Sequence, residues 1–71
     1  MRYLCKSPRW NESMIAAASH EEAATVFAAL CGIKEETVTV REEGSPYGML
    51  LQVTARTTYE VREVRSRARI D

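Results

Sequence analysis

One stretch of the sequence decides the fold: Ser19-His20-Glu21-Glu22-Ala23-Ala24-Thr25-Val26-Phe27-Ala28-Ala29-Leu30-Cys31-Gly32. Ser19 followed three residues later by Glu22 matches a capping box, which marks the first turn of a helix. Apolar residues then recur at i, i+3, i+4 and i+7, and this spacing predicts one apolar face composed of Ala23, Val26, Phe27 and Leu30. Gly32 is the expected C-cap. We therefore predict a helix over 20–31, with Ala24 and Ala28 as a small flank that allows close approach to a sheet.

The residues before this helix predict strands. Residues 2–7 alternate, with Tyr3 and Cys5 on one face, and Pro8 ends the strand because proline cannot donate to a ladder. Residues 8–12 are expected to form a turn. Residues 13–18 allow two interpretations, because their alanines also favour one long helix over 12–31. We favour a strand over 13–18, since a continuous helix would ignore the capping box and interrupt its own apolar face.

The residues after the helix alternate as strands joined by turns. Residues 34–36 are expected to be a polar connection, 37–42 a strand, 43–48 a hairpin loop and 49–56 the next strand. The alternation continues beyond 56, but one strand from 49 to 63 would be about 50 Å long, which is far above the usual length. A turn near 56–58 and a last strand over 59–64 are therefore expected, followed by a basic tail over 65–71.

These elements predict an α+β fold in two layers, with an antiparallel sheet of four to five strands and one helix packed on one face, in ββαββ order. The chain has 71 residues, of which 45% are hydrophobic and 28% are charged. That length and composition are typical of one small globular domain, here over 1–64, with a thin core. The basic C-terminal tail over 65–71 completes the expected organisation.

Catalytic and metal-binding patterns are weak in this sequence. His20 is the one histidine, it is expected at an exposed helix start, and no serine has a neighbouring base. Two cysteines with one histidine are too few for a zinc site within one chain. We therefore expect no enzyme activity, no catalytic or cofactor-binding residues, no metal and no cofactor.

The two cysteines leave their state open. Cys5 and Cys31 both fall on expected core elements, so they are either small buried hydrophobic residues or a disulfide pair. No apolar run reaches the ~18–20 residues that span a bilayer, and a charge within residues 1–6 interrupts what would be the apolar region of a signal peptide. The expected location is the cytoplasm (of the host cell, if the gene is carried by a phage), where thiols stay reduced.

The charges sum to zero but are unevenly distributed. Residues 21–43 hold six acids against two bases, and residues 56–71 hold five arginines against three acids. Such charges are either a solvated surface or a dipolar surface that orients a protein partner. Trp10 beside Arg9 either covers the small core or forms an interaction hot spot, and Tyr47 has the same two interpretations. The residues expected to bind a protein partner are Arg9, Trp10, Glu35, Glu36, Glu42, Glu43 and Tyr47.

An alternative function uses the arginine-rich C-terminus. Its side chains are expected to contact phosphates through charge-assisted, salt-sensitive bonds, as in a small nucleic-acid-binding or regulatory protein. The residues for this alternative are Arg62, Arg65, Arg67 and Arg69. The zero net charge and the single aromatic residue near them, Tyr59, make nucleic acid the less favoured partner. A monomer and a homodimer formed through an exposed strand edge are both compatible with the sequence.

The sequence resembles small phage-encoded inhibitor proteins of the anti-CRISPR type in three features. These are the short first strand, the run Ala18-Ser19-His20-Glu21-Glu22-Ala23-Ala24 into a compact helix, and the following hairpin. The resemblance lies in size and order of elements, and it assigns no site residues. It implies a non-enzymatic protein–protein interaction module that binds and blocks a host nucleic-acid-processing complex, such as a CRISPR or nuclease complex. The expected mechanism is steric occlusion, with the charged surfaces setting the orientation.

Overall fold

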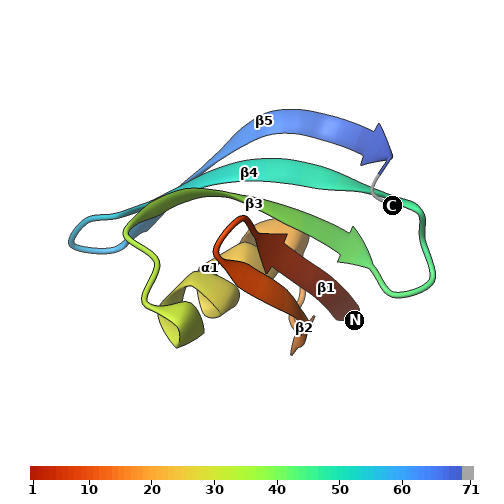
Figure 1. The fold of residues 1–71 in the computed structure, drawn as a ribbon, viewed down its shortest axis with the longest axis horizontal. Coiled ribbons are helices and arrows are strands. Elements are labelled where there is room, and N and C mark those ends of the chain that lie inside the picture. Colours follow the sequence, from red (N-terminus) through yellow and green to blue (C-terminus); the bar gives the residue numbers. More distant parts are fainter. Residues whose placement is uncertain (70–71) are drawn as a thin grey trace.

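The computed structural model describes residues 1–69, which form one helix and five strands (Figure 1). The elements are β1 (Arg2–Ser7), β2 (Trp10–Ala16), α1 (His20–Cys31), β3 (Glu35–Glu42), β4 (Tyr47–Ala55) and β5 (Tyr59–Arg69). The strands form one antiparallel sheet in the order β2-β1-β3-β4-β5, so β2 and β5 are its edges. The α+β class and the antiparallel sheet with one helix are confirmed.

The predicted ββαββ order is wrong, because three strands follow the helix. The turn after β4 needs neither glycine nor proline, since the Arg56 amide donates to the Thr58 carbonyl at 3.0 Å and closes the hairpin. β5 then pairs with β4 from Tyr59 to Arg69. Residues 65–69 are therefore strand where a basic tail was expected, and residues 70–71 lie outside the described part of the chain.

Several element boundaries also differ from the prediction. The strand interpretation of 13–18 is confirmed over 13–16, and the continuous helix is wrong, but β2 begins at Trp10. The reason is a tight hairpin in which Ser7 pairs with Trp10, so that Pro8 and Arg9 alone form the loop. β3 begins at Glu35, which places two residues of the expected polar connection within the strand.

The core lies between α1 and one face of the sheet. Tyr3 and Cys5 from β1, Val38 and Val40 from β3, and Leu51 and Val53 from β4 are each at most 2% exposed. Their alternation along the strands places the intervening residues on the other face. α1 contacts all five strands from the core side, and Figure 1 shows it behind the sheet. The second face of the sheet is therefore left open.

The helix is confirmed over 20–31, and Ala23 and Phe27 of its predicted apolar face are buried, but Val26 and Leu30 of that face are not. Ala24 and Ala28 are fully buried, whereas Val26 is 36% and Leu30 is 73% exposed. The short side chains of Ala24 and Ala28 let α1 lie close to the sheet. Gly32 at φ 69° then reverses the chain, and Ile33 enters the core at 2% exposure. Among the described residues, no helix combines the length and the apolar character that crossing a membrane requires.

Candidate protein-interaction surfaces

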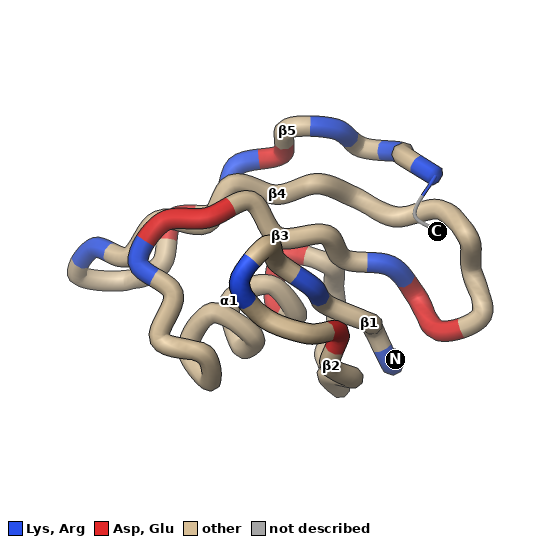
Figure 2. The backbone as a smooth tube through the Cα atoms, in the orientation of Figure 1, with Lys and Arg blue, Asp and Glu red and all other residues tan. Residues whose placement is uncertain are grey.

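The acidic residues expected to meet a partner lie at opposite ends of β3. Glu35 and Glu36 begin this eight-residue strand, Glu42 ends it and Glu43 follows. Seven steps along a strand cover about 24 Å, and Figure 2 shows the two acidic segments at opposite ends of β3. The structure therefore divides the expected partner-binding residues into two groups.

The first group surrounds a hollow of about 350 Å³ lined by Arg9, Trp10, Gly32, Ile33, Lys34, Glu35 and Glu36, which we call the tryptophan hollow. The antiparallel pairing of β1 with β3, in which Lys6 lies opposite Thr39, brings the β1–β2 hairpin to the beginning of β3. The loop after Gly32 supplies the remaining wall. Four of the predicted partner residues are thus gathered from two separate segments.

Charge and exposure in the tryptophan hollow favour contact with another molecule. The Trp10 side chain is 44% exposed. Glu36 is half-buried, and its Oε1 atom is buried with no hydrogen-bond partner. Within residues 1–69, none of Arg9, Lys34, Glu35 and Glu36 forms an ion pair. The pKa of the Cys31 thiol is raised, first by burial and then by the negative charge of Glu36.

The second group surrounds a hollow of about 300 Å³, which we call the tyrosine hollow. Its lining residues are His20, Glu42, Ser45, Tyr47, Gly48, Met49, Ser66 and Arg67. Tyr47 is 40% exposed, and the Arg67 guanidinium lies 4.4 Å from the centre of its ring. This contact joins a residue expected to bind protein with one expected to bind phosphate. Glu43 stands apart, 3.7 Å from Arg2 in an exposed ion pair.

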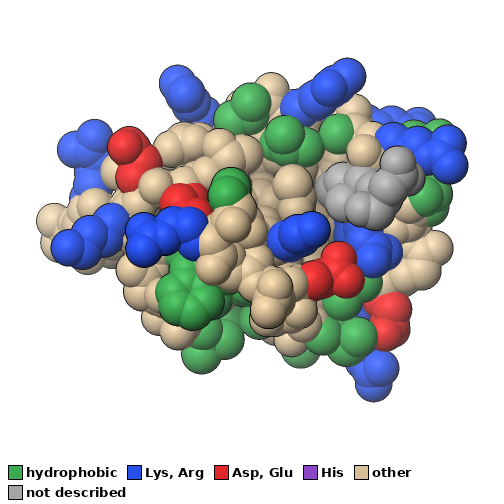
Figure 3. Space-filling view, viewed as in Figure 1, with side chains coloured by type: hydrophobic (Ala, Val, Ile, Leu, Met, Phe, Trp, Pro, Cys, Tyr) green, Lys and Arg blue, Asp and Glu red, His purple; other side chains and the backbone are tan. Residues whose placement is uncertain are grey.

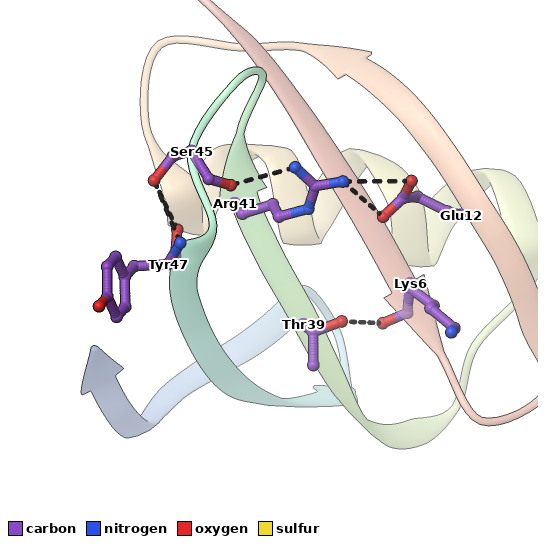
Figure 4. A network of polar contacts seen from close by, with 6 residues as sticks. All are labelled: Lys6, Glu12, Thr39, Arg41, Ser45 and Tyr47. Atoms are coloured by element: carbon purple, nitrogen blue, oxygen red, sulfur yellow. Dashed lines mark hydrogen bonds and ion pairs between the residues drawn. The ribbon is translucent and has the colours of Figure 1, made fainter. Parts of the chain in front are cut away.

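The tyrosine hollow is positioned by Arg41, which sequence analysis did not single out (Figure 4). Arg41 Nη1 donates to the Ser45 carbonyl at 3.1 Å, and Nη2 lies 3.3 Å from Glu12 Oε2. Ser45 Oγ accepts from the Tyr47 amide at 3.2 Å and donates to the Tyr47 carbonyl at 3.1 Å. The sequence signal for Arg41 is an arginine that follows Thr37 and Thr39 on the polar face of an alternating strand, next to a turn.

The four arginines of the nucleic-acid alternative do not form one row. Arg62 pairs opposite Gln52 and Arg65 opposite Leu50, on the open face of the sheet. The β4–β5 register shifts on both sides of Leu50, and Arg67 lies within the second shift, between Arg65 and Ala68, with its guanidinium against Tyr47. Arg69 pairs opposite Tyr47 in the ladder. The bulges explain why the four arginines are not in one row, because each extra residue reverses the face to which the following side chains point.

The cysteines and the histidine occupy packing positions. Cys5 and Cys31 are free thiols, the first fully buried and the second partly buried. The His20 ring packs edge-on against Tyr3 with 4.7 Å between ring centres. Over the described 69 residues, His, Cys, Asp and Glu side chains nowhere gather in a group of three or more that is able to hold a metal ion.

No protein-family model matches the chain, and neither the curated proteins nor the solved structures contain a significant match to it.

Proposed function

We propose that this protein is a non-enzymatic protein-binding module. The observation that carries the proposal is the tryptophan hollow, whose lining combines a 44% exposed Trp10 with four charged residues. Tryptophan and arginine are the residue types most enriched at the energetic centres of protein interfaces. A solvated surface needs no exposed tryptophan, so this combination supports an interface.

The second aromatic residue supports the same function. Tyr47 is 40% exposed and carries Arg67 over its ring. Both hollows therefore combine an aromatic side chain with a cation and a carboxylate, and β3 holds them about one strand length apart. Two such anchors fix the orientation of a partner better than one, and the charges around them suppress wrong orientations.

We further propose that the partner is a host nucleic-acid-processing complex, a CRISPR or nuclease complex, which the protein inhibits by steric occlusion in the manner of small phage-encoded inhibitors. Steric occlusion requires no cofactor, so a small chain of 71 residues is able to act in this way. Inhibition then follows from occupying a surface that the complex needs for its nucleic acid, with no chemical step.

Affinity capture from a bacterial lysate tests the proposal. The tagged protein is expected to retain a partner that Trp10→Ala loses, because truncation removes the aromatic anchor. Met14→Ala is the matched control, since Met14 lies on the same strand with 48% exposure and lines neither hollow. A captured complex is then assayed for cleavage of its nucleic acid. A partner retained equally by both variants contradicts the proposed interface, and undiminished cleavage contradicts the inhibitor function.

One observation favours nucleic-acid binding as a second candidate function. Arg62 and Arg65 both register on the open face of the sheet, and neither forms an ion pair within the described chain. Basic side chains spread over this side of the molecule in Figure 3. Duplex and single-stranded DNA binding, measured by anisotropy at two salt concentrations, tests it: submicromolar, salt-steep binding that Arg62→Gln with Arg65→Gln abolishes supports nucleic acid as the ligand.

A further inference from the structure

The tryptophan hollow also indicates which chemical group of a partner it receives. Its walls come from the β1–β2 hairpin, the loop after Gly32 and the beginning of β3. A volume of about 350 Å³ lies at the lower end of the range for ligand pockets, which suits a single side chain. The hollow therefore resembles a socket for one residue of a partner.

The carboxylate of Glu36 sets the charge that this socket favours. Glu36 Oε1 is buried without a donor, and the described residues place no cation in an ion pair with Glu36 or Glu35. A half-buried carboxylate has lost part of its hydration, so it gains more from an incoming cation than an exposed one does. A partner cation thus compensates a charge that the chain leaves uncompensated.

The hollow's own cations do not remove this preference. Arg9 and Lys34 are both exposed, so water and salt screen their charges. Glu36 is the less solvated of these groups and therefore acts more strongly on a charge inside the hollow. An apolar side chain would bury Glu36 further without giving it a donor, and an acidic side chain would meet the Glu36 carboxylate.

Trp10 adds a surface that holds a cation in place. The indole is the best aromatic partner for an ammonium or a guanidinium group, and Trp10 is 44% exposed at this hollow. A cation on its face and a carboxylate beside it are complementary to one Lys or Arg side chain. We propose that the tryptophan hollow is a socket for a single lysine or arginine side chain presented by a protein partner, which rests on the proposed protein-binding function.

The proposal is tested with the purified chain and short peptides. Trp10 is the only tryptophan of the sequence, so its fluorescence reports directly on the hollow. The probes are glycine-flanked peptides carrying one Arg, one Lys, one norleucine or one Glu. Arg and Lys peptides are expected to change the emission saturably with a dissociation constant of about 1 mM, as a single side-chain contact provides. Norleucine and Glu peptides are expected to give no saturable change.

Two variants tie the response to the hollow. Glu36→Gln is expected to weaken Arg-peptide binding about tenfold, because it removes a charged partner while keeping the shape. Glu63→Gln is the matched control, since Glu63 is exposed on β5 and lines none of the hollow. Circular dichroism checks that both variants keep the fold. No saturable response to Arg and Lys, an equal response to norleucine or Glu, or unchanged binding by Glu36→Gln each overturns the socket.

Failure of the socket proposal is distinguishable from failure of the proposed protein-binding function. A lysate partner that Trp10→Ala loses, combined with no response to basic peptides, keeps the protein-binding function and rejects the socket. A response to basic peptides that requires Glu36, combined with a captured partner that Trp10→Ala retains, supports the socket's preference and rejects the proposed interface.

Discussion

The guanidinium of Arg41 reaches across β1 to the carboxylate of Glu12, with Nη2 and Oε2 3.3 Å apart. Arg41 lies on β3 and Glu12 on the edge strand β2, so the pair connects two strands that share no backbone hydrogen bonds. The same guanidinium holds the Ser45 carbonyl. Arg41 therefore ties the edge of the sheet to the loop that precedes Tyr47.

Replacing Arg41 is expected to destabilise the protein more than the loss of a surface ion pair would. Arg41→Ala removes the bond to Ser45 and the packing of a side chain that is only 22% exposed, and it is expected to lower the free energy of unfolding by about 1–2 kcal/mol. Glu12→Ala is expected to cost about 0.5 kcal/mol, because Glu12 is 40% exposed. Urea unfolding of both variants measures the two effects.

The pair Arg56 and Glu60 is the control for this comparison. Its atoms lie 2.7 Å apart, yet both side chains are 65% exposed at i and i+4. Arg56→Ala is therefore expected to change stability by less than about 0.5 kcal/mol. An equal loss for Arg41→Ala and Arg56→Ala would contradict the structural role of Arg41.

The beginning of α1 gives a second prediction. Ser19 Oγ accepts a hydrogen bond from the Glu22 amide at 3.1 Å. Ser19→Ala leaves that amide without its partner and is expected to cost about 1 kcal/mol of stability, measured by thermal or urea unfolding. Ser13→Ala is the control: its hydroxyl donates only a long, exposed bond of 3.4 Å, and a loss below about 0.5 kcal/mol is expected. Equal losses would mean that the cap contributes nothing specific.

Local signals predicted the helix well because they act within one turn. The capping box and Gly32 define both ends of α1 without reference to the rest of the chain. The buried face of α1 was predicted only in part: Ala23 and Phe27 are buried as expected, but hydrophobicity alone wrongly favours Val26 and Leu30 over Ala24 and Ala28. The outcome depends on how closely the helix approaches the sheet, which is a property of the assembled fold.

Which residues meet in the candidate site depends on the order of strands in the sheet, and the alternation of apolar and polar residues in the sequence does not reveal that order. Residue type alone identified each residue that is expected to bind a partner. The neighbourhood of Trp10 and Glu36, 26 positions apart, exists because β1 lies beside β3. The separation of Glu36 from Glu42 follows from the length of β3, which the expected polar connection over 34–36 had shortened.

The buried face of α1 gives a third prediction. Ala28 is fully buried against the sheet, so Ala28→Leu must displace the core and is expected to cost about 2–3 kcal/mol. Leu30→Ala is expected to change stability by less than about 0.5 kcal/mol, because Leu30 is 73% exposed. Urea unfolding of the two variants decides between the observed face and the predicted one. A larger loss for Leu30→Ala would contradict the orientation of α1.

The thiols give a fourth prediction, which depends on pH. Burial, and to a lesser extent Cys31, raises the pKa of the Cys5 thiol from 9.0 to about 12. The folded state therefore keeps the Cys5 proton at pH values where the unfolded chain loses it. This contribution to stability is complete below pH 9 and is lost as the pH rises toward 12, with a slope of at most about 1.4 kcal/mol per pH unit. The difference in unfolding free energy between the wild type and Cys5→Ala is expected to fall over this range.

The reactivity of the two thiols at pH 8 provides the independent measurement. Cys5 is 0% exposed, whereas Cys31 at the end of α1 is only partly buried. A thiol reagent such as a chromogenic disulfide attacks through the thiolate and needs access, and both requirements are worse for Cys5. Cys5→Ala, which keeps Cys31, is expected to be labelled fast, and Cys31→Ser, which keeps Cys5, only as fast as the fold opens. Equal labelling rates under native conditions would show that the β1 face of the core is open to solvent.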